Sequence, residues 1–168
     1  MSYVQELGGI LSLDDLKNYK PQWRTPVTFT YKDYTVNSMP LPSSGGICLA
    51  QILKSVEPYN IGQYPHNGEQ YIQLLVESER RAYADRAYYM GDPDFVKVPT
   101  ETLLSPDYLK ERMSSFSWEK ASKSSEIAHG KIAGYESDET THYSIVDRFG
   151  NAVAVTTTLN TNYRSKVY

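Results

Sequence analysis

Two threonines and an asparagine near the end of the sequence have the types and spacing of a nucleophile with orienting partners. Thr140 stands at the start of a strand-like run, and Thr158 and Asn160 lie at the end of the next one. A threonine hydroxyl becomes a nucleophile when a base takes its proton and a second polar group holds it in line. Geometry alone favours a plainer interpretation, a polar strand end, so nucleophilic catalysis needs further support.

A β-hairpin is the element that must bring these residues together. Residues 141–147 and 152–159 are rich in β-branched and aromatic side chains and flank Arg148-Phe149-Gly150. Gly150 suits the left-handed position of a three-residue hairpin loop. In such a hairpin the numbers of paired residues sum to about 298, so Thr140 faces Thr158. Asn160 then lies diagonally across from Thr140, about 7–8 Å away.

Several motifs, in the same order along the chain, resemble the γ-glutamyltranspeptidase family. The resemblance covers nearly the whole sequence. The first three motifs match the large subunit of that family and the last three match the start of its small subunit. They are Pro42-Ser43-Ser44-Gly45-Gly46, Tyr83-Ala84-Asp85-Arg86, Gly91-Asp92-Pro93-Asp94-Phe95, Thr140-Thr141-His142-Tyr143-Ser144-Ile145-Val146-Asp147, Gly150-Asn151-Ala152-Val153-Ala154-Val155-Thr156 and Thr158-Leu159-Asn160.

The resemblance implies a self-cleaving N-terminal-nucleophile enzyme. In that family a precursor cleaves itself before a threonine, which matches Thr140, so the implied cleavage site is Glu139-Thr140. Thr158 would hold the Thr140 hydroxyl by hydrogen bonding, and Asn160 resembles the family's substrate-contacting asparagine. The implied reaction transfers the γ-glutamyl group of glutathione and similar compounds to water or an amino acid, through an ester on Thr140.

The resemblance also implies an architecture and a location. The chain is expected to be α+β, as part of a four-layer αββα sandwich that is incomplete in these residues. Residues 1–116 would form the C-terminal part of the large-subunit region. Residues 117–139, rich in Ser, Lys, Glu and Gly, would be a mobile connector ending at the cleavage site, and residues 140–168 would begin the small subunit. The family is usually exported, so a periplasmic or extracellular location is expected, although the first residues carry no signal peptide.

Other interpretations stay open. The resemblance places further substrate contacts and oxyanion donors beyond Tyr168 and an arginine for the substrate carboxylate before Met1. Loss of one oxyanion donor costs about 10²–10³ in rate, so we expect little or no activity from these 168 residues alone. Arg164 also stands where the family usually has glycine, and arginine is strained if that position needs a positive φ. The chain could therefore be an uncleaved structural piece, self-associating through uncovered sheet edges, or a related acylase.

Composition and the remaining polar residues exclude several functions. A net charge of −3 and no basic run argue against a nucleic-acid partner, and no apolar run approaches a membrane span. Cys48, the only cysteine, is expected to be a buried hydrophobe. His66, His129 and His142 share no metal-ligand spacing, so neither a metal nor another cofactor is implied. His142 lies too far along the strand from Thr140 to act as its direct base.

Local patterns predict the other elements. Ser12 to Asp15 reads as a capping box, and residues 25–31 and 34–39 as a hairpin. A Gly-rich break precedes a helix reaching residue 56 and is a tight packing turn rather than an anion site. Residues 69–90 form the longest helix, followed by a turn at 91–94, and Ser105-Pro106 caps a helix over 107–114. In the long helix the expected core stripe is Ile72, Leu75, Val76, Tyr83 and Met90, with Glu77, Glu79, Arg80 and Arg81 mostly on a solvated face.

Overall fold

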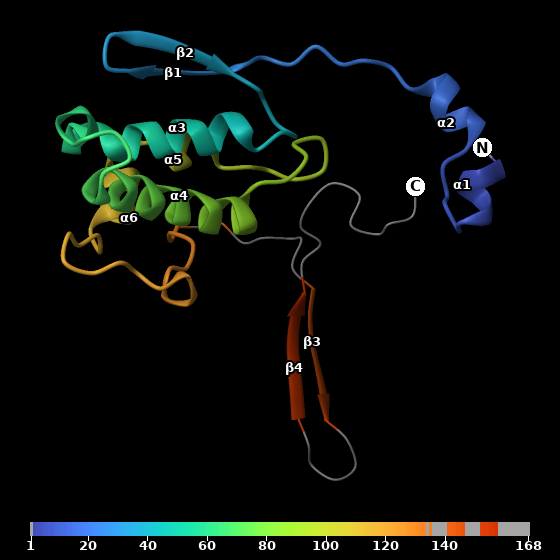
Figure 1. The fold of residues 1–168 in the computed structure, drawn as a ribbon. Helices are drawn as coiled ribbons and strands as arrows, with labels where there is room; N and C mark the ends of the chain where they lie inside the picture. Colours follow the sequence, from blue (N-terminus) through green and yellow to red (C-terminus); the bar gives the residue numbers. More distant parts are fainter. Residues whose placement is uncertain (1, 134, 136–140, 147–151, 158–168) are drawn as a thin grey trace. The chain divides into compact units, whose positions relative to one another are not determined.

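The computed structural model of the chain describes residues 2–133, 135, 141–146 and 152–157 (Figure 1). They fall in two compact units. One comprises Arg24–Ser137, hereafter the helical unit, and the other comprises Met1–Trp23 together with Asp138–Tyr168. Each unit combines helices with a two-stranded antiparallel sheet, so the chain has the α+β class that the sequence predicts.

The second unit contains two short helices and one hairpin. Helices α1 (Ser2–Glu6) and α2 (Leu13–Asn18) lie in its N-terminal segment. The predicted capping box is confirmed, because the Asp15 N–H donates to Ser12 Oγ at 3.1 Å and the Ser12 N–H donates to Asp15 Oδ2 at 2.7 Å. Strands β3 (Thr141–Val146) and β4 (Ala152–Thr157) pair antiparallel and form the predicted hairpin.

The helical unit opens with another hairpin. Strands β1 (Val27–Tyr31) and β2 (Tyr34–Ser38) pair about Lys32 and Asp33, as the sequence predicts. Lys32 takes up the positive φ, 50°, that this tight turn requires. Helix α3 lies between this hairpin and helix α4 (Figure 1).

Helix α3 (Gly45–Val56) approaches the hairpin closely because its second residue has no side chain. A Cβ on Gly46 would overlap the Met39 carbonyl oxygen and lie 3.2 Å from Val27 Cβ. The Gly-rich break is therefore the predicted packing turn. Cys48 is 6% exposed, as expected of a small buried hydrophobe, and burial raises the pKa of its thiol.

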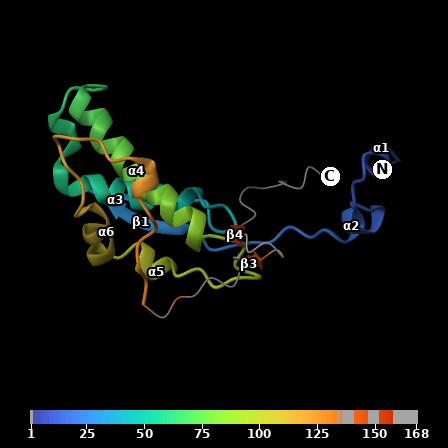
Figure 2. The same ribbon diagram turned by 90° about the horizontal axis from the view of Figure 1, so that it is seen from below.

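The remaining elements complete the core around α3. Helix α6 packs against both α3 and α4 (Figure 2). One hydrophobic cluster joins Ile47, Tyr89, Leu103, Tyr108 and Leu109, and a second joins Val56, Leu74 and Met113. The elements are η1 (Glu57–Tyr59), η2 (Ile61–Gln63), α4 (Glu69–Tyr89), α5 (Thr100–Leu103), α6 (Pro106–Met113) and η3 (Ser124–Glu126).

The buried face of α4 differs from the predicted one. Ile72, Val76 and Tyr83, expected in the core, are 47%, 38% and 58% exposed. Glu77 and Arg81, expected on a solvated face, are 1% and 3% exposed. The prediction was wrong because these charges pair with each other and with backbone groups of other segments, which offsets the cost of removing them from water. The buried residues of the helix are Leu74, Glu77, Ser78, Arg81, Ala82, Asp85 and Tyr89.

Candidate active site

The β3–β4 hairpin has the register that the proposed nucleophile requires. Its outermost described pair is Thr141 with Thr157, whose numbers sum to the predicted 298, and every other described pair keeps the same sum. The predicted pairing of Thr140 with Thr158 would continue this ladder by one position. Glu139, Thr140, Thr158 and Asn160 themselves lie outside the described residues.

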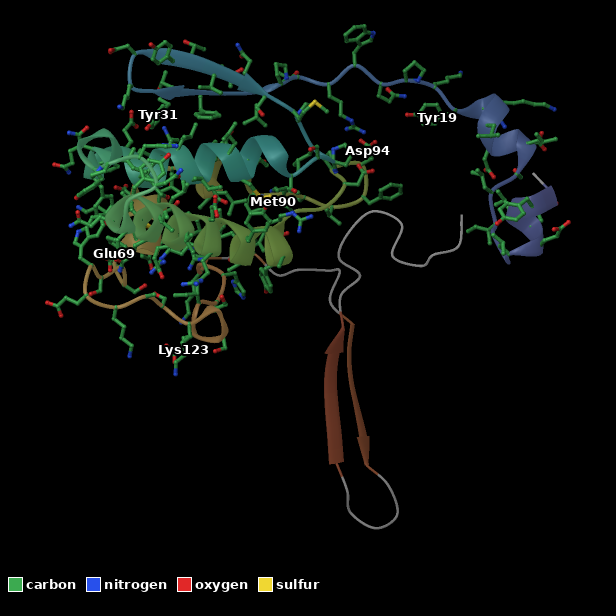
Figure 3. The ribbon with its side chains drawn as sticks, viewed as in Figure 1. Tyr19, Tyr31, Glu69, Met90, Asp94 and Lys123 are labelled. Atoms are coloured by element: carbon green, nitrogen blue, oxygen red, sulfur yellow. The ribbon has the colours of Figure 1, made fainter. Side chains whose placement is uncertain are left out.

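The segment that leads toward Glu139 is held against α4 along its described part. Figure 3 shows Glu69 and Met90 at the two ends of α4, and Lys123 in the connector. Gln73 Nε2 donates to the Ser117 carbonyl at 2.8 Å, near the start of the connector. Composition predicted a mobile connector over 117–139. That mobility stays a prediction; the described part of the connector belongs to the helical unit, where α4 supplies polar partners for its backbone.

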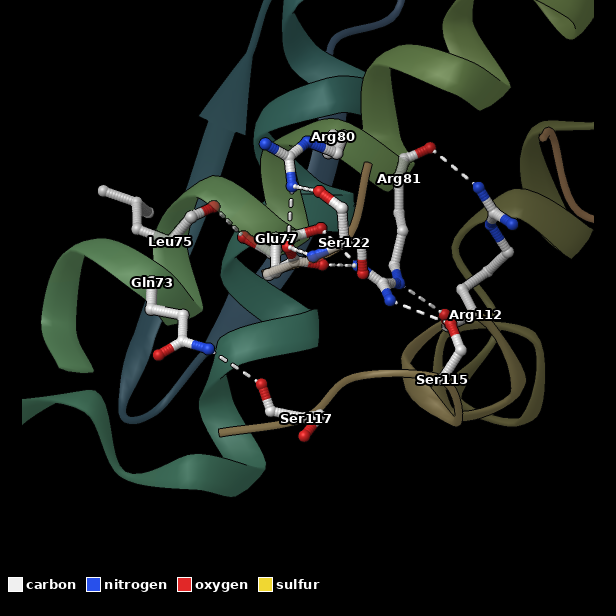
Figure 4. Close-up of polar contacts among 10 residues, drawn as sticks. Gln73, Leu75, Glu77, Arg80, Arg81, Arg112, Ser115, Ser117 and Ser122 are labelled. Atoms are coloured by element: carbon white, nitrogen blue, oxygen red, sulfur yellow. Dashed lines mark hydrogen bonds and ion pairs between the residues drawn. The ribbon is translucent and has the colours of Figure 1, made fainter. Parts of the chain in front are cut away.

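Further along the connector, Ser122 is attached to α4 through the Glu77 carboxylate (Figure 4). That carboxylate accepts from Arg81 Nη1 at 2.6 Å, from Arg80 Nη1 at 2.7 Å and from the Ser122 N–H at 2.8 Å. Arg80 also donates to the Ser122 carbonyl. Burial acts to raise the pKa of Glu77, but the hydrogen bonds from Arg81 and Ser122 outweigh it and hold the pKa below its ordinary value. Glu77 is therefore a charged anchor for the connector.

Still further along the connector, Gly130 is attached to α4 through the Asp85 carboxylate. The Gly130 N–H donates to Asp85 Oδ1 at 2.8 Å, and the Tyr89 hydroxyl donates to the Gly130 carbonyl. Arg112 Nη2 lies 3.1 Å from Asp85 Oδ1, and Gln51 Nε2 donates to Asp85 Oδ2 at 3.0 Å. Asp85 thus ties α3, α4, α6 and the connector together.

A side chain at position 130 would force the neighbouring side chains to shift. A Cβ there would overlap the Tyr108 hydroxyl and lie 2.6 Å from Arg112 Cδ. Next to it, the His129 ring stacks on Tyr88 at 3.6 Å between centroids. We call the enclosure of Gly130 by Asp85, Tyr89, Tyr108 and Arg112 the Gly130 socket.

In two loops of the helical unit, polar side chains form hydrogen bonds that hold neighbouring segments together. Arg86 Nε donates to Ser44 Oγ at 2.7 Å, which joins α4 to the start of α3. In the turn after α4, Asp94 accepts from Arg24, and the Arg24 hydrogen bond lowers the pKa of Asp94. Among the described residues, no group of His, Cys, Asp and Glu side chains is arranged to hold a metal ion. None of the described helices has the length and apolar character needed to cross a membrane.

Sequence reasoning missed the α4 attachments. Glu77, Arg81 and Asp85 recur at intervals of four, alongside the small residues Ser78 and Ala82. Residues four apart share a helix face, so oppositely charged residues interspersed with small ones were a usable signal of a buried polar face. Their partners in the connector carry no comparable signal, because they contribute backbone groups.

Comparison with known proteins gives the chain a family. The sequence model of the gamma-glutamyltranspeptidase family matches residues 1–168. The glutathione hydrolase proenzyme of Escherichia coli (strain K12) is 49% identical over 160 residues, covering 95% of this chain and 28% of that protein. The acylase ACY 1 proenzyme of Pseudomonas sp. (strain V22) is 36% identical over 158 residues, covering 94% of this chain and 28% of that protein.

The likeness extends to a solved structure. The crystal structure of Helicobacter pylori gamma-glutamyltranspeptidase superposes with a TM-score of 0.73 at 36% identity, over 82% of this chain and 40% of that one. The chain spans 28% of the length of the two curated relatives above. The match of the family model over all 168 residues shows that the chain belongs to the γ-glutamyltranspeptidase family of N-terminal-nucleophile enzymes.

Proposed function

We propose that the protein containing this chain is a γ-glutamyltransferase and glutathione hydrolase with Thr140 as its nucleophile. A 49% identity to a glutathione hydrolase proenzyme supports the reaction class. The observation that carries the choice of residues is the register of the β3–β4 hairpin, whose described pairs all have numbers summing to 298. If that register continued by one position, it would pair Thr140 with Thr158, which supports the choice of these two residues.

Self-cleavage comes first. The Thr140 hydroxyl attacks the Glu139 carbonyl carbon, the C–N bond breaks, and the peptide becomes an ester with a free Thr140 amine. Water then hydrolyses that ester, which leaves a carboxylate on Glu139 and restores the Thr140 hydroxyl. An α-amine has a pKa of about 7.7–8.0, so near neutral pH it accepts a proton more readily than a lysine at about 10.4. Cleavage therefore exposes the nucleophile and creates its base in one event.

Transfer follows through a second ester. The Thr140 hydroxyl passes its proton to the α-amine and attacks the γ-carbonyl of the donor, and the departing amine takes that proton. The γ-glutamyl ester on Thr140 is then released by water or by the amine of an amino acid. Thr158 holds the attacking hydroxyl in line, and the amide of Asn160 binds the polar head group of the γ-glutamyl donor.

In the complete protein we place this chain within a four-layer αββα sandwich. Likeness to the Helicobacter pylori structure over 82% of the chain supports this placement. Taken alone, the chain would expose sheet edges that further strands cover in the sandwich, so it is expected to self-associate. We also propose that the complete protein is exported to the periplasm or the medium and acts on glutathione there.

Intact-mass measurement of the purified chain tests self-cleavage. Fragments ending at Glu139 and starting at Thr140 are expected, with none in Thr140→Ala and slower formation in Thr158→Ala. Thr140→Ser is the matched control, because it keeps the hydroxyl and should still cleave. A chain that stays intact through prolonged incubation would favour the alternative, an uncleaved structural piece.

Turnover is best tested in a longer protein. In a full-length precursor, hereafter the chimeric precursor, these 168 residues replace the matching segment of the Escherichia coli relative. We expect it to cleave itself and to hydrolyse a γ-glutamyl anilide, and we expect the 168 residues alone to show little or no hydrolysis. Self-cleavage without turnover of the anilide would refute the assigned substrate while leaving the nucleophile in place.

A related acylase with another substrate is the second candidate, because an acylase proenzyme is 36% identical over 158 residues. A glutaryl anilide separates the two, since it differs from the γ-glutamyl anilide only by lacking the α-amino group. A γ-glutamyl enzyme built to bind that ammonium group should prefer the γ-glutamyl anilide at least about 100-fold. Equal rates or a preference for glutaryl would favour the acylase.

A further inference from the structure

A pocket of about 480 Å³, hereafter the α3–α6 pocket, is lined by residues of α3, η1 and α6. Helices α3 and α6 pack against each other (Figure 2), and η1 continues the chain directly after α3. The pocket therefore belongs to the helical unit alone, and every residue that lines it is described. Its volume falls within the range of about 300–1,000 Å³ that is usual for small-molecule sites.

The walls of the α3–α6 pocket are mainly apolar. Leu109 and Met113 lie one turn apart on α6 and are 4% and 5% exposed, so they connect the pocket to the core. Tyr59 lines the pocket from η1 and is half-buried, and the exposed rings of Pro58 and Pro106 complete the apolar part of the lining. A compound with an apolar body gains free energy when it covers such side chains, because apolar surface is removed from water on both partners.

The charged groups of the pocket favour an anion. Lys54 in the last turn of α3 and Lys110 in the last turn of α6 both line it. Among the lining residues, all of which the structure describes, Glu57 carries the one carboxylate. Glu57 Oε1 accepts from the Lys32 N–H at 2.5 Å, so this carboxylate is engaged with the turn of the β1–β2 hairpin. The two ammonium groups therefore leave a net positive charge beside the apolar walls.

We propose that the α3–α6 pocket binds a small organic anion with an apolar body, namely an aromatic or medium-chain carboxylate. The apolar body lies against Tyr59, Leu109 and Met113, and the carboxylate lies between the ammonium groups of Lys54 and Lys110. A lysine is suited to this role because its apolar stem covers the wall of a pocket while its charged head stays at the rim. Binding of this kind does not use the Thr140 hydroxyl, so it is independent of the proposed function.

A fluorescent anion tests the site in the uncleaved Thr140→Ala chain. Anilinonaphthalene sulfonate has an aromatic body and one negative charge, and it should bind at one site per chain with a Kd on the order of 10–100 µM. Methyl NMR locates the bound probe. The Met113 methyl signal should shift during the titration, whereas the signals of Met39 and Met90, which do not line the pocket, should stay in place.

Removal of the lysine charges tests the preference for an anion. Lys54→Met and Lys110→Met keep an apolar stem, and each should weaken binding of anilinonaphthalene sulfonate about 2–5-fold. The double variant should weaken it about 5–25-fold. Phenylnaphthylamine, which has the same rings without the sulfonate, should bind all these variants equally. Lys120→Met is the matched control, because Lys120 is an exposed lysine outside the pocket and its loss should change neither affinity.

Competition and the complete protein give the remaining tests. Decanoate and naphthoate should both displace the probe, and the stronger competitor identifies the aliphatic or the aromatic body as the better fit. The chimeric precursor should bind the probe as the chain does, and its self-cleavage should be the same in the lysine variants, so either proposal can fail alone.

Four results would overturn the α3–α6 pocket as an anion site. They are a Met113 signal that stays in place, lysine variants that weaken both probes alike or neither of them, and loss of binding in the chimeric precursor, where another part of the protein would then cover the pocket. The fourth is a Met113 signal that shifts with chain concentration in the absence of probe, because a second copy of the chain would then occupy the pocket.

Discussion

The buried ion pair of α4 gives the sharpest test of how this chain is held together. Glu77 and Arg81 are 1% and 3% exposed and lie 2.6 Å apart. Removing one partner of such a pair costs about 3–5 kcal/mol, because the other charge stays buried. After Glu77→Ala, Arg81 keeps the Arg112 carbonyl and the Ser115 hydroxyl as acceptors, but the Ser122 N–H loses the Glu77 carboxylate to which it donates.

We therefore expect Glu77→Ala to lower the free energy of unfolding by about 4 kcal/mol. Arg81→Ala should cost about 3 kcal/mol, because Glu77 keeps its bonds from Arg80 and Ser122. The double variant should cost about 5 kcal/mol, which is a coupling of about 2 kcal/mol. Domains of this size have about 5–15 kcal/mol in total, so each single change removes a large share.

Urea unfolding of the Thr140→Ala chain measures these values. Trp118 contacts Tyr59 and Phe116 in the helical unit, so its fluorescence reports the unfolding of that unit. Glu79→Ala is the matched control on the same helix, and it should change the stability by less than about 0.5 kcal/mol. Single-variant costs below about 1 kcal/mol, or a double variant whose cost equals the sum of the two, would refute the conclusion that Glu77 and Arg81 form a buried and coupled ion pair.

The same pair predicts a pH dependence with a definite sign. The folded-state pKa of Glu77 lies below its ordinary value of 4.5, so its contribution is fully present above that value. It is lost as pH falls through the lowered folded pKa. The difference in stability between the chain and Glu77→Ala should thus be constant from neutral pH to about 5 and shrink only in stronger acid. Shrinkage already between pH 7 and 5 would contradict the assignment.

Two predictions concern the start of α3. Gly46→Ala should lower stability by about 1–3 kcal/mol in urea unfolding, because its Cβ would overlap the Met39 carbonyl oxygen, whereas Gly62→Ala, with nothing within 4 Å, should not. Cys48 is buried with a raised pKa, so a thiol reagent at neutral pH should label it only as the chain unfolds. Labelling of the folded chain at the rate of an exposed thiol would contradict the packing of α3.

Part of the candidate site could be predicted from the sequence, and part of it could not. The register of β3–β4 was predictable, since loop length and the alternation of side chains set it within about 20 residues. The roles of Glu139, Thr140, Thr158 and Asn160 follow from motif resemblance and stay predictions. The Gly130 socket was not predictable, because the sequence near Gly130 does not show that Asp85 receives its N–H.

The sequence by itself determined what depends on neighbouring residues: the Ser12 capping box, the two hairpins and the helix boundaries. Each of these is set by hydrogen bonds and sterics over a few residues. Only the tertiary structure decided which face of α4 is buried and where the connector is held. The partners of Arg81 and Asp85 that settle both questions lie 31 and 45 residues away, and they are the backbone groups of Arg112 and Gly130. Every residue type has these groups, so the identity of a residue does not reveal which of them will meet a buried charge.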